Sequence, residues 1–328
     1  SGFVDTYADP YAGPSSRVLL GAPLTITAST PSGFTDTYGD EYAGVALPRF
    51  AGSIQAIDFT PTLIRLTCLP PTEAWARIEV GGTDDTTPIP SESDIARVQR
   101  LCDEAGVVIV ITGTAGPDLT AIGVNTNPSP LLAQLQQIAE DAGGLFYTDR
   151  EGVARYLTRN APFMLTDVDD AVTLPSDATL LAPVAMSLEL ALVRTRVIVE
   201  YGDPDPVTNV RPTVTVEDPE QAGDYGWRDY RAAVQLQDEA DALAYAEAAL
   251  VALSASWTMP NATVAMAKAG LADIAVCAAL EPGSWVTLPV LPDGAPLADY
   301  AAPALGYTEL LSSSDWQITY HLAPLTMP

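Results

Sequence analysis

The clearest periodic pattern of apolar and polar positions lies in residues 129–157. Its first part predicts a helix, because its large apolar residues recur three and four positions apart and would share one buried face. These residues are Leu131, Leu135, Ile138 and Ala142. We expect Ser129 to cap this helix and Pro130 to take its first position. Gly143 or Gly144 supplies the left-handed residue that ends it.

The residues after this helix predict a β-hairpin. Residues 145–148 and 153–157 are strand-like, and the polar turn 149–152 between them ends in Gly152, a residue suited to positive φ. The whole stretch therefore predicts a capped helix docked on a hairpin.

A similar unit precedes it. Residues 91–105 predict a helix capped by Ser91 or Ser93 and ended by Gly106. The apolar, β-branched run 107–112 predicts a buried strand, and residues 119–124 predict its partner after a turn. Residues 83–160 are therefore interpreted as an α+β insertion of two helix-hairpin units.

Short strands punctuated by Gly and Pro flank this insertion. In the N-terminal part they predict a small barrel or sandwich, with strands at 18–27, 49–54, 57–60 and 62–69. In the C-terminal part, residues 193–201 alternate most clearly. Further strands are predicted at 211–216, 227–236, 263–267, 285–290, 304–311 and 316–322, with one packed helix at 238–253. On that helix we expect Leu243, Ala246, Leu250 and Leu253 to share the buried face.

The segment LLAQLQQIAEDAGGLFYTDREGVARY resembles the helix-then-hairpin segment of tail hub proteins (minor tail proteins) of long-tailed, siphovirus-type bacteriophages, especially those of actinobacteria. Upstream, Arg-Phe-x-Gly-x-Ile and Ile-Arg-Leu-Thr-Cys are similar to the first β-barrel of that family. Downstream, the Val-x-Val-x-Tyr strand, the Asp-x-Ala helix and the Trp-x-x-x-Tyr-x-Leu-x-Pro end are similar to its second barrel. The resemblance covers residues 17–326 in consistent order.

The resemblance implies an α+β, mainly β fold with two β-barrel-like domains and an inserted helix-plus-hairpin region. The domains would be 1–82, expected to be incomplete at its N-terminus, 83–160, and 161–328. It further implies a virion structural protein of the tail tip, a baseplate-hub homotrimer forming a ring through which DNA passes. Its partners would be the distal tail protein, the tape measure protein and the tail fibre or spike proteins.

Composition and charge narrow the function classes. The chain has 328 residues, 48% of them hydrophobic, which is enough for two or three packed domains. Its net charge is −27 and its 15 basic residues are scattered, so sequence-specific nucleic acid binding is not expected. The acidic charge either serves solubility or forms a surface that DNA slides past. No run is long enough for a membrane span. The chain begins at Ser1, so we expect a processed product or a fragment.

Candidate metal and thiol chemistry is sparse. Cys68, Cys102 and Cys277 are too far apart for a metal motif and are expected to be free thiols. The chain has one histidine, His321, and this excludes most Ser-His, Cys-His and zinc chemistry. We expect His321 on the surface of a strand.

Two acidic groups are candidate calcium sites. Residues 1–13 and 32–44 form a short repeat whose acids are Asp5, Asp9, Asp36, Asp40 and Glu41. A second group is Asp167, Asp169 and Asp170. We favour a duplicated loop and a solvated turn over calcium, because neither has the ligand alternation of a calcium loop. No catalytic, cofactor-binding or metal residue is assigned, and no cofactor is expected.

Two other functions stay open beside the structural one. A cell-wall hydrolase could use two carboxylates, but the sequence has no Gly-x-Ser-x-Gly, P-loop or His-Glu-x-x-His motif. A receptor- or glycan-binding tail module could use exposed aromatic residues. The tryptophans, however, are expected mostly in the core; they are Trp75, Trp227, Trp257, Trp285 and Trp316.

Overall fold

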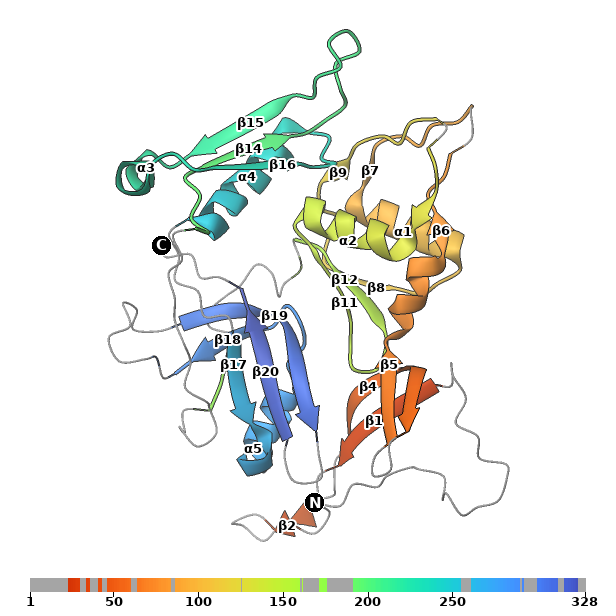
Figure 1. Cartoon of the computed structure of the whole chain (residues 1–328), viewed down its shortest axis with the longest axis vertical. Helices are drawn as coiled ribbons and strands as arrows, with labels where there is room; N and C mark the ends of the chain where they lie inside the picture. Colours follow the sequence, from red (N-terminus) through yellow and green to blue (C-terminus); the bar gives the residue numbers. More distant parts are fainter. Residues whose placement is uncertain are drawn as a thin grey trace.

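The protein is an α+β structure with more strand than helix, as predicted. We analysed a computed structural model of the chain (Figure 1). The structure describes residues 23–29, 34–35, 41–42, 46–59, 64–83, 86–124, 126–159, 161, 171–175, 191–254, 261–289, 291, 300–311 and 316–323. Several predictions lie outside these residues: the start of the first strand, the acids of residues 1–13, Asp36, Asp40, the acids of 167–170, Trp257 and the turn 312–315.

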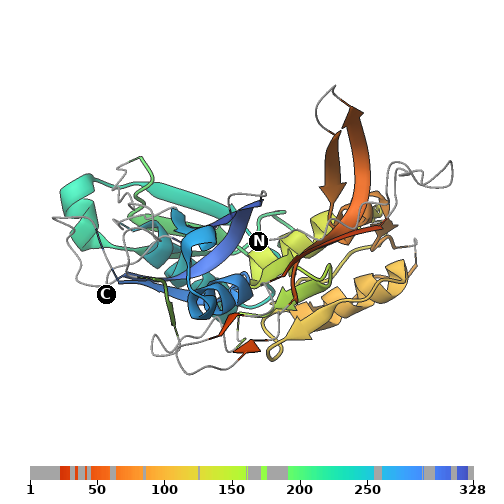
Figure 2. The same cartoon turned by 90° about the horizontal axis from the view of Figure 1, so that it is seen from below.

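The N-terminal strands form one antiparallel sheet in the order β1-β4-β5. Its strands are β1 (Pro23–Ser29), β4 (Ala46–Phe59) and β5 (Ile64–Leu69). The prediction of two strands at 49–54 and 57–60 was wrong, because β4 is continuous and the pairing only shifts register between Ile54 and Ala56. A bulge absorbs the extra residue without ending the strand. Figure 2 shows β4 and β5 projecting beyond the rest of the molecule.

The central part has one three-stranded sheet beside two helices that pack on each other. The helices are α1 (Asp94–Ala105) and α2 (Leu131–Ala142), and the sheet has the order β11-β12-β8. Its strands are β11 (Leu145–Thr148), β12 (Ala154–Leu157) and β8 (Val110–Thr112). The β11–β12 hairpin is confirmed, with Gly152 at φ 83°.

The prediction of two separate helix-hairpin units was wrong. Strand β8 pairs in parallel with β12, whereas β9 (Asp118–Leu119) pairs with β7 (Glu92–Ser93) at the start of α1. The run 107–112 is also less buried than expected, since Val108 is 82% exposed. Because β9 has only two residues and these pair with β7, β8 pairs with the hairpin strand β12 instead.

The helix caps are confirmed at three of four ends. The Ser93 hydroxyl accepts a hydrogen bond from the Ala96 N–H, and Gly106 and Gly143 end their helices with φ near 68° (67° and 69°). The prediction that Ser129 caps α2 was wrong. The cap position is Pro130, because Ser129 and Pro130 form β10 and pair with β6 (Glu79–Val80). The first helical N–H, that of Leu131, donates to the Ile78 carbonyl instead of to a side chain.

A second three-stranded sheet, β15-β14-β16, carries helix α4 (Glu239–Leu253) on one face. Its strands are β14 (Arg196–Glu200), β15 (Thr213–Glu217) and β16 (Asp229–Ala233). The predicted alternation is confirmed, since Val197 and Val199 are fully buried. The buried face of α4 is instead Ala242, Ala246 and Leu250; Leu243 is 40% exposed, so placing it on that face was wrong. Small alanines let the helix lie close to the sheet.

The C-terminal part is a five-stranded sheet in the order β13-β18-β19-β20-β17. Its strands are β13 (Val172–Thr173), β18 (Trp285–Leu288), β19 (Tyr300–Leu311), β20 (Trp316–Leu322) and β17 (Asn261–Ala265). In β20 the predicted alternation is confirmed: Ile318, Tyr320 and Leu322 are buried and His321 is exposed. The remaining elements are β2 (Phe34–Thr35), β3 (Glu41–Tyr42), η1 (Pro71–Arg77), α3 (Pro219–Tyr225), η3 (Met266–Lys268) and α5 (Leu271–Ala279).

The described residues form two hydrophobic cores. One joins α1 and α2 to the β14–β16 sheet and α4, and the chain links these parts through a bridge between Leu119 and Leu236. The other lies between α5 and the five-stranded sheet. The sheets among the described strands are open, so the β-barrel-like closure and the three domain boundaries stay predictions. None of the helices in this described part is long and apolar enough to cross a bilayer.

Candidate functional site: the junction at the end of helix α5

The N-terminal sheet, the β11–β12 hairpin and the C-terminal sheet meet at the C-terminal end of helix α5. The last carbonyls of a helix have no partner within the helix and carry partial negative charge. Here they are met by side chains from distant parts of the chain. The Arg49 Nη1 donates to the Ala278 carbonyl at 2.9 Å, the Arg150 Nη1 to the Leu280 carbonyl at 2.6 Å, and the Tyr320 hydroxyl to the Cys277 carbonyl.

Arg49 reaches this helix end from strand β4. Its side chain is 3% exposed and forms an ion pair with Glu309 of β19, with Nη2 2.7 Å from Oε2. The Arg49 Nε donates to both Glu309 oxygens, and the Trp316 indole N–H donates to the same carboxylate. The arginine thus bonds to the helix end and to the last hairpin at once, which ties the N-terminal sheet to the C-terminal sheet.

Arg150 reaches the same helix end from the β11–β12 turn. Its side chain is 4% exposed, and its Nη1 also lies 2.9 Å from Glu281 Oε1. The guanidinium carbon lies 3.8 Å from the centroid of the Tyr307 ring, so the aromatic face is a second partner for the charge. Its Nε and Nη2 make no hydrogen bond.

The turn that presents Arg150 is held by Asp149. One carboxylate oxygen accepts from the Glu151 and Val153 N–H groups, and the other accepts from Arg155 Nε at 2.6 Å. These bonds fix the backbone of the turn and therefore the direction of the arginine. The ordered turn therefore holds the Arg150 side chain toward the end of α5, which follows 130 positions later in the chain.

Both arginines of the junction are buried, while their partners Glu309 and Glu281 are 11% and 29% exposed. Burial raises the pKa of Glu281, while the charge and hydrogen bond of Arg150 oppose that rise. Burial also raises the pKa of Tyr307 to about 12. Removing one partner of such a pair leaves an uncompensated buried charge, which costs about 3–5 kcal/mol.

A cavity of about 490 Å³ lies beside the junction, lined by Arg49, Arg150, Arg155 and the acids Asp149, Glu151 and Glu281. Of these three acids, Asp149 and Glu281 are ion-paired with arginine. Leu157, which also lines this cavity, lies so close to Gly283, at φ +91°, that a Cβ on the glycine would be 2.8 Å from the Leu157 Cδ1. The arrangement supports tight packing between parts rather than proton transfer.

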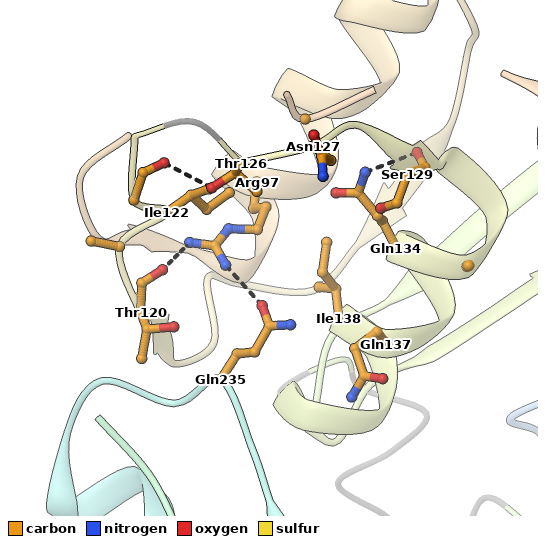
Figure 3. A pocket seen from close by; sticks show the side chains of 14 residues that line it. Arg97, Thr120, Ile122, Thr126, Asn127, Ser129, Gln134, Gln137, Ile138 and Gln235 are labelled. Carbon is orange, nitrogen blue, oxygen red and sulfur yellow. Dashed lines mark hydrogen bonds between the residues drawn. The ribbon is translucent and has the colours of Figure 1, made fainter. Parts of the chain in front are cut away.

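A second hollow, of about 450 Å³, lies between helix α2, residues 120–123 and 126–129, and Gln235 (Figure 3). Arg97, which is 2% exposed, lines it with every nitrogen engaged: Nε donates to Glu92, Nη1 to the Gln235 amide oxygen and Nη2 to the Thr120 carbonyl. The other polar lining groups are amides and hydroxyls. The lining offers no carboxylate, imidazole or thiol, so its serine and threonine hydroxyls have no side-chain base beside them among the lining residues.

Asp141 lies next to this hollow at the end of α2. It accepts a hydrogen bond from Gln137 Nε2, while its second oxygen, Oδ2, is buried without a hydrogen bond. Burial therefore raises the pKa of Asp141 to about 6.

The residues singled out in the sequence do not come together. Cys102 and Cys277 are buried in different cores, Cys68 is half-buried, and all three are free. His321 bonds Thr308 and Asn261 on the outside of β20, as expected for a surface residue. Among the described residues no three His, Cys, Asp or Glu side chains form a metal cluster.

The described tryptophans differ in solvent exposure. Trp75 is buried, and Trp285 and Trp316 are half-buried. Trp227 is 53% exposed, so the expectation of core burial was wrong for this residue. It lies just before β16, where the chain turns at Gly226, outside the face that α4 covers.

Sequence reasoning missed Arg49 and Arg150. Both stand within strand or turn patterns, where an arginine normally reaches solvent, and their partners lie more than 100 residues away. The sequence offers one indication of their role: Arg49 is a charged residue next to an apolar strand, and Arg150 is a basic residue within an acidic turn.

Neither a protein-family model nor a curated protein sequence matches the chain. Solved structures do. The tail protein from Neisseria meningitidis MC58 matches with a TM-score of 0.60 and 14% identity, over 93% of this chain and 88% of that one. The 43 kDa tail protein of prophage MuSo2 from Shewanella oneidensis matches with a TM-score of 0.55 and 10% identity, over 93% and 90%. Prophage tail protein gp18 from Listeria monocytogenes EGD-e matches at 0.51 and 13%, over 88% and 82%. The chain therefore has the fold of phage tail proteins.

Proposed function

We propose that this chain is a structural component of a bacteriophage tail tip, a hub or minor tail protein, and not an enzyme. The observation that carries the proposal is the fold shared with three tail proteins over 88–93% of the chain. The resemblance of the helix-hairpin segment to tail hub proteins of siphovirus-type actinobacteriophages supports it independently of the fold.

The junction at α5 supports a mechanical role. A tail component must hold its parts in a fixed relative position, and here buried arginines from two parts of the chain bond to one helix end in a third. Neither hollow presents a free acid and base pair that would favour a cell-wall hydrolase. In this proposal the residues supply interfaces rather than chemistry.

The assembly follows from the resemblance. The protein would form a homotrimeric ring that joins the distal tail protein and the tape measure protein to the fibres or spike, and DNA would pass through it. Heterologous contacts that close into a ring give this symmetry. With a net charge of −27, the surface facing the channel is expected to be acidic, so that DNA is not retained.

Two measurements test the proposal. Labelling intact virions with antibody against this chain should place it at the tail tip by electron microscopy. Sedimentation of the isolated protein should give the mass of three chains, about three times 34.5 kDa. Labelling on the capsid, or hydrolysis of purified host cell wall by the protein, would contradict it.

A further inference from the structure

The outer face of the β15-β14-β16 sheet has a built arrangement of polar side chains. Helix α4 packs on the other face, so the outward residues of the three strands meet solvent. At one end of the sheet, pairing places Arg196 of β14 between Glu217 of β15 and Asp229 of β16 in a single row. Arg196 Nη2 lies 2.6 Å from Asp229 Oδ1 and its Nη1 lies 3.7 Å from Glu217 Oε1.

Trp227 stands at the end of this row. It precedes Asp229 by two positions, and Asp229 precedes Arg231 by two, so the spacing of a strand sets the three side chains toward one face. The Arg196 guanidinium carbon is 5.5 Å from the centre of the Trp227 ring. With 53% of the residue in water, part of the indole surface is free for a ligand. The exposed indole lies beside ordered polar groups, so a ligand with an apolar and a polar side could contact both at once.

The charges around Trp227 cancel, whereas the exposed Glu200 adds one acid at the opposite end of the same face. Arg196 and Arg231 carry two positive charges, and Asp229 and Glu217 carry two negative ones, within a chain whose net charge is −27. A polyanion would be repelled by the chain as a whole, and a polycation would find no excess of acid here. The face therefore fits an uncharged polar partner.

We propose that this face binds a neutral saccharide. The C–H face of a pyranose ring stacks on the Trp227 indole, while its hydroxyls, which both donate and accept, bond to the carboxylate of Asp229 and the guanidinium of Arg231. Arg196 holds Asp229 and the indole in place before the ligand arrives, which reduces the ordering cost of binding. This site does not depend on the proposed place of the chain in the tail.

The test is a glycan array probed with the full-length protein, followed by isothermal titration calorimetry of wild type and variants with the best neutral oligosaccharide. Trp227→Ala should weaken binding about tenfold or more, a loss of about 1.4 kcal/mol. Trp227→Phe should recover part of the binding, because an aromatic face remains. The matched control is Val207→Ala, a residue 90% exposed in the loop at the opposite end of the same sheet, which should leave binding unchanged.

Equal melting temperatures of the variants would show that the fold is intact. Three results would overturn the proposal: no neutral glycan bound by the wild-type protein, binding only of sulfated or carboxylated glycans, or equal binding by wild type and Trp227→Ala. Loss of binding with a normal position in the virion would support the saccharide site without affecting the proposed structural role.

Discussion

Arg49 and Glu309 are 260 positions apart in the sequence, yet Nη2 of the first lies 2.7 Å from Oε2 of the second. Their side chains are 3% and 11% exposed, so the pair is shielded from water on nearly every side. Because Arg49 also bonds the Ala278 carbonyl, this pair joins the N-terminal sheet to both the last hairpin and the end of α5.

Breaking this pair should cost far more than breaking a surface pair. We expect Arg49→Met to lower the free energy of unfolding by about 3–5 kcal/mol, because Glu309 then stays buried without its cation. The double variant Arg49→Met/Glu309→Leu should recover part of that loss, since no charge is left alone. Urea unfolding followed by circular dichroism measures both.

The control is Arg231→Gln, which removes one side of a pair in which the arginine side chain is 68% exposed. It should change stability by about 0–1 kcal/mol. Equal effects of the Arg49 and Arg231 variants would refute the view that the junction stabilises the arrangement of the parts.

Asp141 should make the free energy of unfolding fall as the pH rises from about 4 through 6. Its folded-state pKa is about 6, above the ordinary value of 3.8, so its contribution is fully present below about pH 4 and is lost as the pH rises through 6. Asp141→Asn should therefore stabilise the protein at pH 7.5 by about 3 kcal/mol and have almost no effect at pH 4.

Asp205→Asn offers the opposite case on the exposed loop after β14. The Thr208 and Val207 N–H groups lower the pKa of Asp205, so losing its charge should reduce stability above the ordinary carboxyl pKa. Thermal melting across pH 4–8 compares the two variants. A gain for Asp141→Asn that is the same at both pH values would mean that the buried charge is not its cause.

Any side chain at Gly283 should lower the free energy of unfolding. A Cβ there would lie 2.8 Å from Leu157 Cδ1, and the residue has φ +91°. We expect Gly283→Ala to destabilise the protein by about 1–3 kcal/mol, through overpacking and backbone strain. Gly223→Ala is the matched control, because a Cβ at that position in α3 meets nothing within 4 Å. It should be neutral or stabilise by up to about 1 kcal/mol, and calorimetry should separate the two.

The cysteines should differ in reactivity in the folded protein. Burial raises the pKa of Cys102 and of Cys277 to about 11, so few thiolates form there and the sulfurs are covered. Cys68 is only half-buried, although burial raises its pKa as well. A thiol reagent at pH 8 should label Cys68 first, and the other two only after denaturant is added. Fast labelling of all three in the native state would contradict the burial of both cores.

The parts of the fold that were predictable from the sequence are those set by neighbours in the chain. Helix α1, with Ser93 and Gly106 at its ends, depends on residues within a few turns, and so does the β11–β12 hairpin with Gly152. The pairing of β8 with β12 was not predictable, because it depends on which strand reaches β8 across about 40 positions. The Ser129 cap failed for the same reason: strand pairing with β6 had already engaged that residue.

The junction at the end of α5 could not be predicted from the sequence for a related reason. A buried arginine has the same local signature as a surface arginine, and only the carbonyls at the end of α5 distinguish Arg49 and Arg150 from the others. Helix α5 itself was missed, because its sequence is short and nearly all apolar and lacks a polar face from which a helical period could be recognised. Trp227 was misplaced because strand context alone does not say which face a helix will cover.

The helix end at Cys277–Leu280 therefore bonds to side chains from two other regions, and these buried bonds oppose hinge motion between them. A pull on strand β4 passes through Arg49 to the same four residues that hold the β11–β12 turn through Arg150. Torque applied to one region would reach the others as a rigid-body rotation, because the bonds that would have to slip are buried and point in different directions. Replacing either Arg49 or Arg150 should therefore allow the region that it joins to α5 to rotate relative to the C-terminal sheet.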